Sequence, residues 1–251
     1  GISDPAATKD LGEYVKLAPD RIRYDLRKKQ YEYCAGSTPY FKHDIDQVLY
    51  ALSGERALAI DSTHGRRTHS WVHKDIKREL SIDCMAALTR CICQNKQLEA
   101  SYVSLSSGKT ARLLTPLAII NDGLRWHVRC FDHGKEDNNF RDFNLGRFIT
   151  VEEKEESKVS IEKDIEWNTI VRLSVIPHPA AEHVETIRYD YGFEGESKTI
   201  ELRSCIVGYF LRHWNIDYSD AASENPNSHQ LYLINKQELI DQGVPLWAFD
   251  I

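Results

Sequence analysis

The chain has 251 residues, of which 41% are hydrophobic and 28% charged, a composition typical of a water-soluble globular protein. It contains no apolar run long enough to span a membrane and no signal-peptide pattern at its start, so we expect a cytoplasmic protein with no membrane partner. The formal net charge of −6 is uneven, with +2 on residues 1–80, −1 on residues 81–157 and −7 on residues 158–251. An anionic partner is therefore expected to meet the first two thirds of the chain.

The chain opens with a predicted helix and a basic hairpin. Asp4 followed by Pro5 is typical of a helix start, and helical apolar spacing continues to Leu17. Two strand-like runs follow at residues 21–24 and 30–34, joined by a basic turn. A helix before a basic hairpin is the second half of a winged helix-turn-helix, in which the helix enters the major groove of DNA and the hairpin, or wing, follows the backbone.

The expected DNA contacts lie on the exposed side of this helix and in the turn of the wing: Ala6, Thr8, Lys9, Arg27, Lys28 and Lys29. Small side chains let a helix approach base edges, and basic side chains suit phosphates. A winged helix-turn-helix needs further helices before its recognition helix, whereas this sequence starts at Gly1 without an initiator Met. We therefore expect a fragment or a shortened form in which DNA binding is impaired.

Residues 41–80 are expected to form a helical linker. Apolar residues at helical spacing predict a short helix over residues 44–52, and a polar stretch follows. The histidines of this region, His64, His69 and His73, fit no compact metal-binding motif, so we predict neither a metal nor a cofactor.

The middle of the chain, residues 81–157, predicts one helix followed by five short strands. Ser81 is the expected cap of a helix reaching Asn95, with a buried stripe made of Ile82, Met85, Ala86, Leu88, Thr89 and Ile92. The strands are expected at residues 97–105, 110–119, 124–132, 139–144 and 148–153. Short strands with tight turns suggest a small, strongly bent barrel.

The last third predicts an α/β sandwich behind a charged linker at residues 152–163. Strands are expected at residues 169–175, 199–202 and 230–234, and helices at residues 179–189 and 204–214. Alternating strands and helices over so short a span fit one small sheet covered by helices.

Arginines and aromatic residues recur in the middle strands. Because side chains alternate along a strand, Trp126 and Val128 are expected on one face and His127 and Arg129 on the other. Arginine forks beside a histidine suit a phosphate or carboxylate ligand, although arginines on the solvent face of a small barrel are also common. We expect Trp126 and Phe143 in the core, and Asp142 to hold an arginine by an ion pair.

The middle segment resembles the WYL domain, named for a Trp-Tyr-Leu triplet that here reads Trp126-His127-Val128. The flanking runs EASYVS, RLLTP, WHVRCF and FRDFNLGRF match the same pattern, and the resemblance extends over nearly all of the chain. It implies an α+β multidomain protein: a partial winged helix-turn-helix over residues 1–40, an Sm-like or SH3-like barrel over residues 81–157, and a ferredoxin-like C-terminal extension used in dimer contacts over residues 165–251.

The resemblance also implies a function. Members of this branch are homodimeric bacterial transcriptional regulators, often beside phage-defence operons, and WYL domains are regarded as modules that sense nucleic acids. The residues carried over as ligand contacts are Tyr102, Ser104, Arg112, His127, Arg129, Arg141 and Arg147. Arg147 could equally be a structural residue that closes the barrel.

The sequence offers little support for catalysis. It has no Gly-x-Ser-x-Gly elbow, P-loop or Gly-x-Gly-x-x-Gly, and the acidic residues Asp132 and Asp137 are expected in a solvated loop. We therefore expect a repressor whose homodimer binds an inverted-repeat operator in double-stranded DNA and releases it when a nucleic acid or nucleotide binds the middle domain. Two alternatives stay open: a nuclease, and a sensor that regulates a partner protein without binding DNA.

Overall fold

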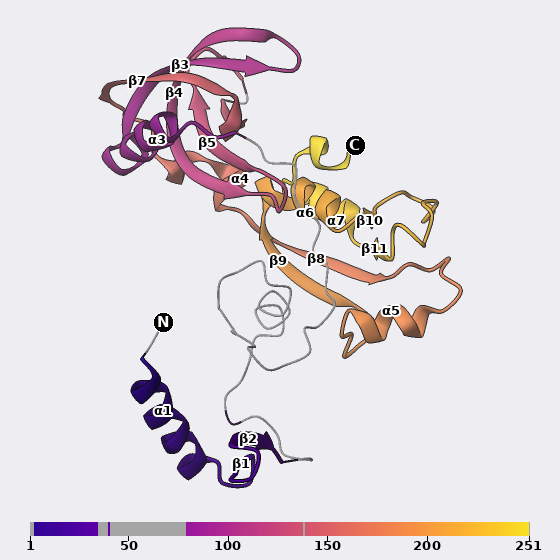
Figure 1. Cartoon of the computed structure of the whole chain (residues 1–251). Helices are drawn as coiled ribbons and strands as arrows, with labels where there is room; N and C mark the ends of the chain where they lie inside the picture. Colours follow the sequence, from indigo (N-terminus) through magenta and orange to yellow (C-terminus); the bar gives the residue numbers. More distant parts are fainter. Residues whose placement is uncertain (1–2, 35–39, 41–78, 138, 251) are drawn as a thin grey trace. The chain divides into compact units, whose positions relative to one another are not determined.

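The computed structural model describes residues 3–34, 40, 79–137 and 139–250. The chain divides into two compact units, Gly1–Ile76 and Lys77–Ile251, each of which we describe by itself (Figure 1). The helix expected over residues 44–52 and the three histidines of the polar stretch lie outside the described residues. No helix in the described ranges is long and apolar enough to cross a lipid bilayer.

The first unit contains the expected helix and hairpin. Helix α1 (Asp4–Leu17) starts one residue earlier than predicted, with Ser3 at the cap position. Strands β1 (Ile22–Asp25) and β2 (Gln30–Tyr33) pair antiparallel. None of the residues of α1 is buried among the parts of the chain that the structure describes, so its apolar side chains stay at least partly accessible.

The second unit begins with helix α3 (Ile82–Gln94), capped as predicted because the Ser81 hydroxyl accepts from the Cys84 amide at 3.2 Å. The predicted buried stripe is wrong in part, since Ile82 is 83% exposed. The residues that are buried are Cys84, Ala87, Leu88 and Cys91. The predicted stripe contains no cysteine, whereas Cys84 and Cys91 are buried here as small hydrophobic residues. The buried face of α3 is therefore rotated relative to the predicted one.

Five antiparallel strands follow: β3 (Lys96–Ser104), β4 (Gly108–Asn121), β5 (Trp126–Asp132), β6 (Phe140–Asn144) and β7 (Phe148–Glu156). Their order in the sheet is β6-β5-β4-β3-β7, and a short 3₁₀ turn, η1 (Leu145–Arg147), joins β6 to β7. Shifts of register in the β3–β7 and β4–β5 pairs mark bulges, which bend a sheet. Strand β7 runs three residues further than predicted, so the first part of the expected charged linker is strand.

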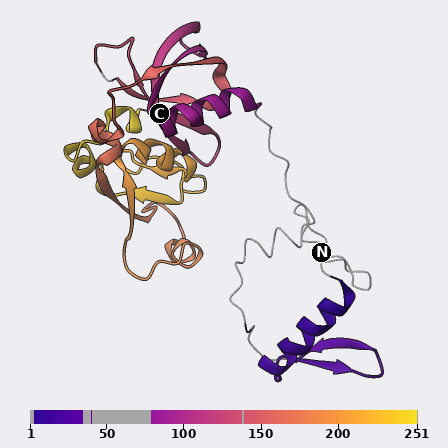
Figure 2. The same ribbon diagram turned by 90° about the vertical axis from the view of Figure 1, so that its left-hand side faces the viewer.

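Helix α3 covers this sheet, as Figure 2 shows, and packs against β3, β4 and β7. The shared core contains Leu88 of the helix with Leu98, Leu114, Val128 and Phe143 of the strands. Phe143 therefore lies in the core as expected, but the same expectation is wrong for Trp126, which is 46% exposed. Trp126 is the first residue of β5 and pairs with Asn121 at the turn end of the hairpin, beyond the area that the core covers.

The rest of the unit is a mixed α/β layer. It begins with η2 (Ile161–Lys163) and α4 (Ile165–Asn168), and its sheet has the order β10-β11-β8-β9. The remaining elements are β8 (Ile170–Pro177), α5 (Val184–Asp190), β9 (Lys198–Arg203), η3 (Ser204–Ile206), α6 (Val207–His213), β10 (Ile216–Asp217), β11 (Leu231–Leu233), α7 (Lys236–Asp241) and η4 (Leu246–Phe249). The helix predicted over residues 179–189 starts later because the Ala180 amide donates to His178 Nδ1, which holds a turn there.

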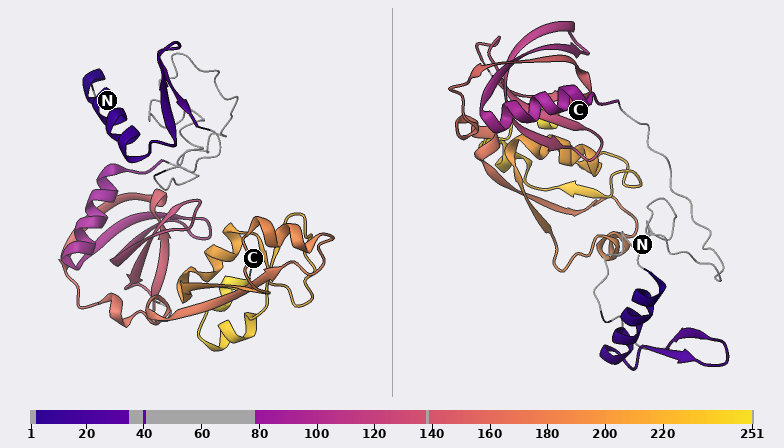
Figure 3. Two further views of the ribbon diagram at one scale, coloured as in Figure 1. Left: turned by 90° about the horizontal axis from the view of Figure 1, so that it is seen from below. Right: turned by 60° about the vertical axis from the view of Figure 1, so that its left-hand side comes forward.

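The expected ferredoxin-like arrangement is wrong. In that arrangement a helix joins two parallel strands, whereas β8 and β9 are antiparallel neighbours and α5 sits in the excursion between them (Figure 3). The only parallel pair in the described sheets is β10 with β11, which a thirteen-residue loop connects. The core of this layer, formed around Leu173, Leu211, Leu233 and Leu239, is separate from that of the first sheet.

Candidate functional site

Arg129 is the largest of the fully buried side chains among the described residues, with an exposed fraction of 2%. Its Nε and one terminal nitrogen donate to the two carboxylate oxygens of Asp164 at 2.7 and 3.0 Å. The guanidinium also donates to Asp142 at 3.3 Å and to Glu166 at 2.8 Å. One guanidinium is thus held by three carboxylates, an arrangement that we call the Arg129 clasp.

The clasp joins the two layers of the unit. Arg129 lies on the outer face of β5, and Asp142 is its direct partner across the β5–β6 pair, which confirms the ion pair expected for Asp142. Asp164 caps α4, where it also accepts from the Trp167 amide at 3.1 Å. Strand alternation explains why Arg129 and Asp142 face away from the first core, and the cap position explains why Asp164 faces them.

The charges of the clasp shift its pKa values. Burial lowers the pKa of Arg129, but the hydrogen bonds to Asp164 and the charge of Asp142 raise it by more, so the guanidinium stays protonated. Burial raises the pKa of Asp142, and Arg129 and the hydroxyl of Tyr209 offset only part of that rise. Burial, with the charge of Asp142, also raises the pKa of Tyr209, which keeps its hydroxyl a donor.

Tyr209, on α6, extends the clasp toward the β4–β5 turn. Its hydroxyl donates to Asp142 at 3.0 Å, and its ring lies on the ring of His127 with 4.8 Å between centroids. His127 in turn contacts Asp122 through Nε2 at 2.8 Å. Tyr209 could not be identified from the sequence, because an aromatic residue on an amphipathic helix carries no signal of its partner 67 positions earlier.

A cavity of about 310 Å³ opens beside the clasp, which we call the junction pocket; its lining residues are Arg129, Phe140, Arg141, Asp142, Glu166, Tyr209 and Trp247. They come from β5 and β6 on one side and from α4, α6 and η4 on the other. Arg141 is exposed and pairs with Cys130 through the backbone of the β5–β6 ladder, while its side chain makes no hydrogen bond or ion pair in the ranges that the structure covers. The pocket therefore combines three aromatic rings with the guanidinium and carboxylates of the clasp.

The structure brings only some of the predicted ligand residues together. Arg129 and Arg141 share the junction pocket, and His127 lies next to it on Tyr209. Tyr102 is buried in the first core, where its hydroxyl accepts from the Asn144 amide at 3.0 Å. Ser104 lies at the β3–β4 turn, 3.0 Å from the hydroxyl of Ser106.

Two further predicted arginines lie apart from the pocket. Arg112 forms an ion pair with Asp132 at 3.2 Å, at the end of β5 opposite His127. The expectation that Asp132 is solvated is wrong, since it is fully buried and balances this arginine. Arg147 is half-buried in η1. Much of the positive charge that the sequence gathers on these strands is thus neutralised by acidic neighbours.

In the first unit, Thr8 and Lys9 are exposed on α1, and Ala6 is half-buried. The three basic residues of the wing turn are exposed, with the turn closed by the Arg27 and Lys28 amides, which donate to Asp25. Lys28 also pairs with Glu32, and this hydrogen bond raises the pKa of the amine. Arg27 and Lys29 have no side-chain partner among the described residues, so both stay available to an anion.

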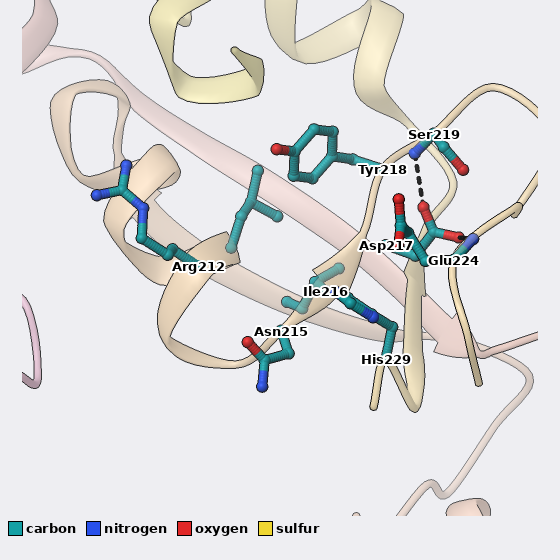
Figure 4. Close-up of a pocket in the computed structure, with 9 residues that line it drawn as sticks. Arg212, Asn215, Ile216, Asp217, Tyr218, Ser219, Glu224 and His229 are labelled. Carbon is teal, nitrogen blue, oxygen red and sulfur yellow. Dashed lines mark hydrogen bonds between the residues drawn. The ribbon is translucent and has the colours of Figure 1, made fainter. Parts of the chain in front are cut away.

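A second cavity, of about 300 Å³, lies around β10 (Figure 4). Asp217 lines it and accepts from the Ser219 and Glu224 amides and from the buried His178. Because these contacts occupy both oxygens of Asp217, its role is to hold the loop before β11. No group of three or more histidines, cysteines or carboxylates in the described parts is arranged to hold a metal.

Family comparisons agree with this architecture. Residues 83–153 match the model of the WYL domain, and residues 170–239 match that of the BrxR transcriptional regulator, C-terminal dimerization domain. The first match spans α3 and the sheet that carries Arg129. The second spans β8 to α7, the layer that supplies Tyr209.

Three relatives align along nearly the whole chain, and each is named DNA-binding transcriptional repressor CapW. The protein from Escherichia coli (strain KTE188) is 30% identical over 250 residues, which cover 95% of this chain and 81% of the relative. That from Stenotrophomonas maltophilia is 31% identical with the same coverage, and that from Pseudomonas aeruginosa is 29% identical, covering 96% and 82%. The chain therefore belongs to the family of the CapW transcriptional repressors.

Proposed function

We propose that this protein is a homodimeric DNA-binding transcriptional repressor that responds to a nucleic acid or nucleotide through its middle domain. The observation that carries the proposal is the similarity to relatives named DNA-binding transcriptional repressors over 95% of the chain. The matched dimerization domain supports the homodimer. Operator DNA lies in the cytoplasm, which is where we place the protein.

DNA reading is assigned to α1 and the wing. Thr8 and Lys9 are exposed on the helix, with Ala6 half-buried beside them, and Arg27, Lys28 and Lys29 are exposed in the turn. A two-fold symmetric dimer presents two such helices, so the operator is expected to be an inverted repeat. The resemblance to regulators beside phage-defence operons makes such an operon the proposed target.

Effector binding is assigned to the WYL domain, whose five-stranded sheet we interpret as the Sm-like or SH3-like barrel. Among the seven proposed contacts, Arg141 and Arg147 are the best direct ones, because neither is paired with a carboxylate in the described part of the chain. His127 and Arg129 are better suited to position neighbours. Tyr102, Ser104 and Arg112 support the sheet and its turns through the contacts given above.

The proposal is tested by selecting duplexes from a random pool with the full chain and measuring their affinity by fluorescence anisotropy at several salt concentrations. The double variant Arg27→Ala, Lys29→Ala is expected to weaken binding to every selected duplex. Loss of two phosphate contacts lowers the slope of log affinity against log salt by about 2. Lys135→Ala, an exposed lysine of the β5–β6 loop, is the matched control and keeps the original slope. Equal slopes for the double variant and the control would refute the DNA-reading role of the wing.

A further inference from the structure

We propose that two copies of this chain associate by inserting Tyr189 of each copy into an apolar groove in the α/β layer of the other. The occupant of the groove is therefore a second copy of the chain. This inference rests on the proposed homodimer, and it names the surface and the side chain that hold the two copies together. It follows from an exposed ring and an open apolar cavity in the same layer.

The groove is a cavity of about 150 Å³ between the sheet of the α/β layer and α6. Its lining contains the aromatic residues Tyr191, Phe193, Phe210 and Trp214, with aliphatic side chains from β8, β9, β10 and β11. Lys198 is the one charged residue of the lining, and its amine already donates to the Tyr191 carbonyl at 2.7 Å. Such a wall attracts apolar groups and disfavours an anion, which would lose its water there without gaining a partner.

The size of the groove suits one aromatic ring. Apolar cavities of about 150 Å³ in proteins hold one benzene molecule. Trp214 lines the groove with 47% of its surface exposed, so the cavity opens at the surface of the layer. A tyrosine fits such an opening, because its ring fills the apolar part while its hydroxyl stays at the wet mouth.

Tyr189 is the complementary group. It is 88% exposed, the highest value for a large hydrophobic residue within residues 170–239. Its side chain makes no hydrogen bond, ion pair or ring contact with any residue that the structure describes. It follows the buried Ile187 by two positions, about 200° further round α5, so the helix turns it away from its own core. An aromatic ring exposed in this way is typical of the side chains that anchor an interface.

The exposed ring and the groove are neighbours. Tyr191 and Phe193, which line the groove, follow Tyr189 by two and four positions. The guanidinium carbon of Arg188, in the last turn of α5, lies 5.9 Å from the centre of the Phe193 ring. The end of α5 is therefore at the rim of the groove. A two-fold axis beside this rim makes two equal contacts at once, because each copy contributes one ring and one groove.

A second copy is the occupant that the comparisons favour. Residues 170–239 match the model of a C-terminal dimerization domain, and this span contains Tyr189 and every residue that lines the groove. Figure 1 shows α5 at the end of the α/β layer that is farthest from the first sheet, so the WYL domain of the same chain does not cover it. A different protein in the groove would leave Tyr189 exposed, whereas a second copy covers both features. The two ring contacts form the centre of an interface whose surrounding side chains exclude water.

The first test measures the dissociation constant of the dimer by sedimentation equilibrium of the full chain. Tyr189→Ala is expected to raise this constant by about a hundredfold, because every dimer loses two anchors of about tenfold each. Tyr189→Phe keeps the ring and should dimerise like the unchanged protein. Leu105→Ala is the matched control, since Leu105 is 89% exposed in the β3–β4 turn, and it should also leave the constant unchanged. An unchanged constant in Tyr189→Ala, or an equal rise in the control, overturns the proposal.

A crosslink identifies the groove directly. Azidophenylalanine, a photoreactive residue close to tyrosine in size, replaces Tyr189, and chains labelled with light and heavy nitrogen are mixed so that crosslinks between copies have a mixed mass. After irradiation, the peptide with the azide should be joined to peptides of the other isotope that contain Phe193, Phe210 or Trp214. Crosslinks that stay within one chain, or that reach only peptides outside residues 170–239, show that the ring does not dock in the groove.

The same measurements separate this inference from the function on which it rests. If the unchanged protein is a dimer and Tyr189→Ala dissociates no more readily, the surface is wrong and the homodimeric repressor stands. If the unchanged protein has the mass of a single chain at every concentration, both the surface and the homodimer are wrong.

Discussion

A single guanidinium surrounded by three carboxylates is the central residue-scale feature of this protein. Strand alternation predicted that Arg129 shares a face with His127, and an ion pair with an arginine was expected for Asp142; the structure identifies that arginine as Arg129, its partner across the β5–β6 pair. Asp164 and Glu166 could not be predicted as partners, because they follow a turn and a 3₁₀ helix whose path no local pattern defines. The same reasoning misplaced Asp132, which looks like a loop residue by sequence and is a buried counter-charge.

Removing the guanidinium leaves buried carboxylates without compensation. We expect Arg129→Ala to lower the free energy of unfolding by about 3–5 kcal/mol, as for other broken buried ion pairs. Urea denaturation of the variant and the unchanged protein measures this difference. Arg172→Ala removes an exposed pair with Glu201 and should cost less than about 1 kcal/mol. A loss for Arg129→Ala as small as that of the control would show that the clasp adds no stability.

The carboxyl group of Asp122 makes the stability of the fold depend on pH. Burial raises the pKa of its carboxyl group, but the hydrogen bonds from His127 and from the Leu124 and Arg125 amides lower it by more. A carboxyl group whose pKa is lower in the folded state contributes stability above its unfolded pKa of about 4, and this contribution is lost as the pH falls through the folded value.

We therefore expect Asp122→Asn to lower the free energy of unfolding at pH 7 by about 1.5–3 kcal/mol, the range for a hydrogen bond to a charged group. The difference in stability between the variant and the unchanged protein should become smaller below pH 4. Chemical denaturation at a series of pH values gives both curves. Parallel curves across the whole range would assign the effect of the substitution to shape alone and not to the charge of Asp122.

At the scale of elements, the helices and strands that depend on neighbouring residues in the sequence could be predicted. The cap at Ser81, the helix before the wing and all five strands of the first sheet follow from capping and alternation, and the structure has them. The topology of the second sheet depends on which strands pair, and that choice is made by tertiary contacts. The helix–strand pattern of residues 169–234 is compatible with several orders of the strands in the sheet. The observed order places β8 and β9 side by side.

Helix α6 packs closely against η4 at Gly208. A Cβ atom on Gly208 would lie 2.8 Å from the Cα of Ala248 and from the ring of Trp247. Gly208→Ala is thus expected to push η4 away and cost about 1–3 kcal/mol, as overpacking usually does. Because Trp247 lines the junction pocket, its fluorescence spectrum should shift as well. Gly195→Ala, where nothing lies within 4 Å of the new atom, should leave stability and spectrum unchanged.

For the whole molecule, the distribution of charge assigns different tasks to different regions. The net negative charge concentrates in the last third, where basic residues are fewest and which also contains the matched dimerization domain. Negative charge there repels DNA phosphates and leaves the basic wing as the preferred contact. The overall charge of −6 alone would have argued against a nucleic-acid partner.

A homodimer predicts that stability depends on concentration. If folding and association are coupled, the unfolding temperature rises as the chain concentration is increased, because dissociation accompanies unfolding. Thermal scans over a hundredfold range of concentration measure this, and sedimentation equilibrium should give twice the chain mass. A single chain mass together with a constant unfolding temperature would contradict the dimer.

The Arg129 clasp also limits how this chain can change over generations. Any single exchange among Arg129, Asp142 and Asp164 passes through an intermediate with an unbalanced buried charge, and such intermediates are rarely viable. The three positions are therefore expected to change together in distant relatives, for example to a set of apolar residues of similar volume. An alignment of the family would reveal this as correlated replacement, whereas exposed pairs such as Arg172 with Glu201 should drift independently.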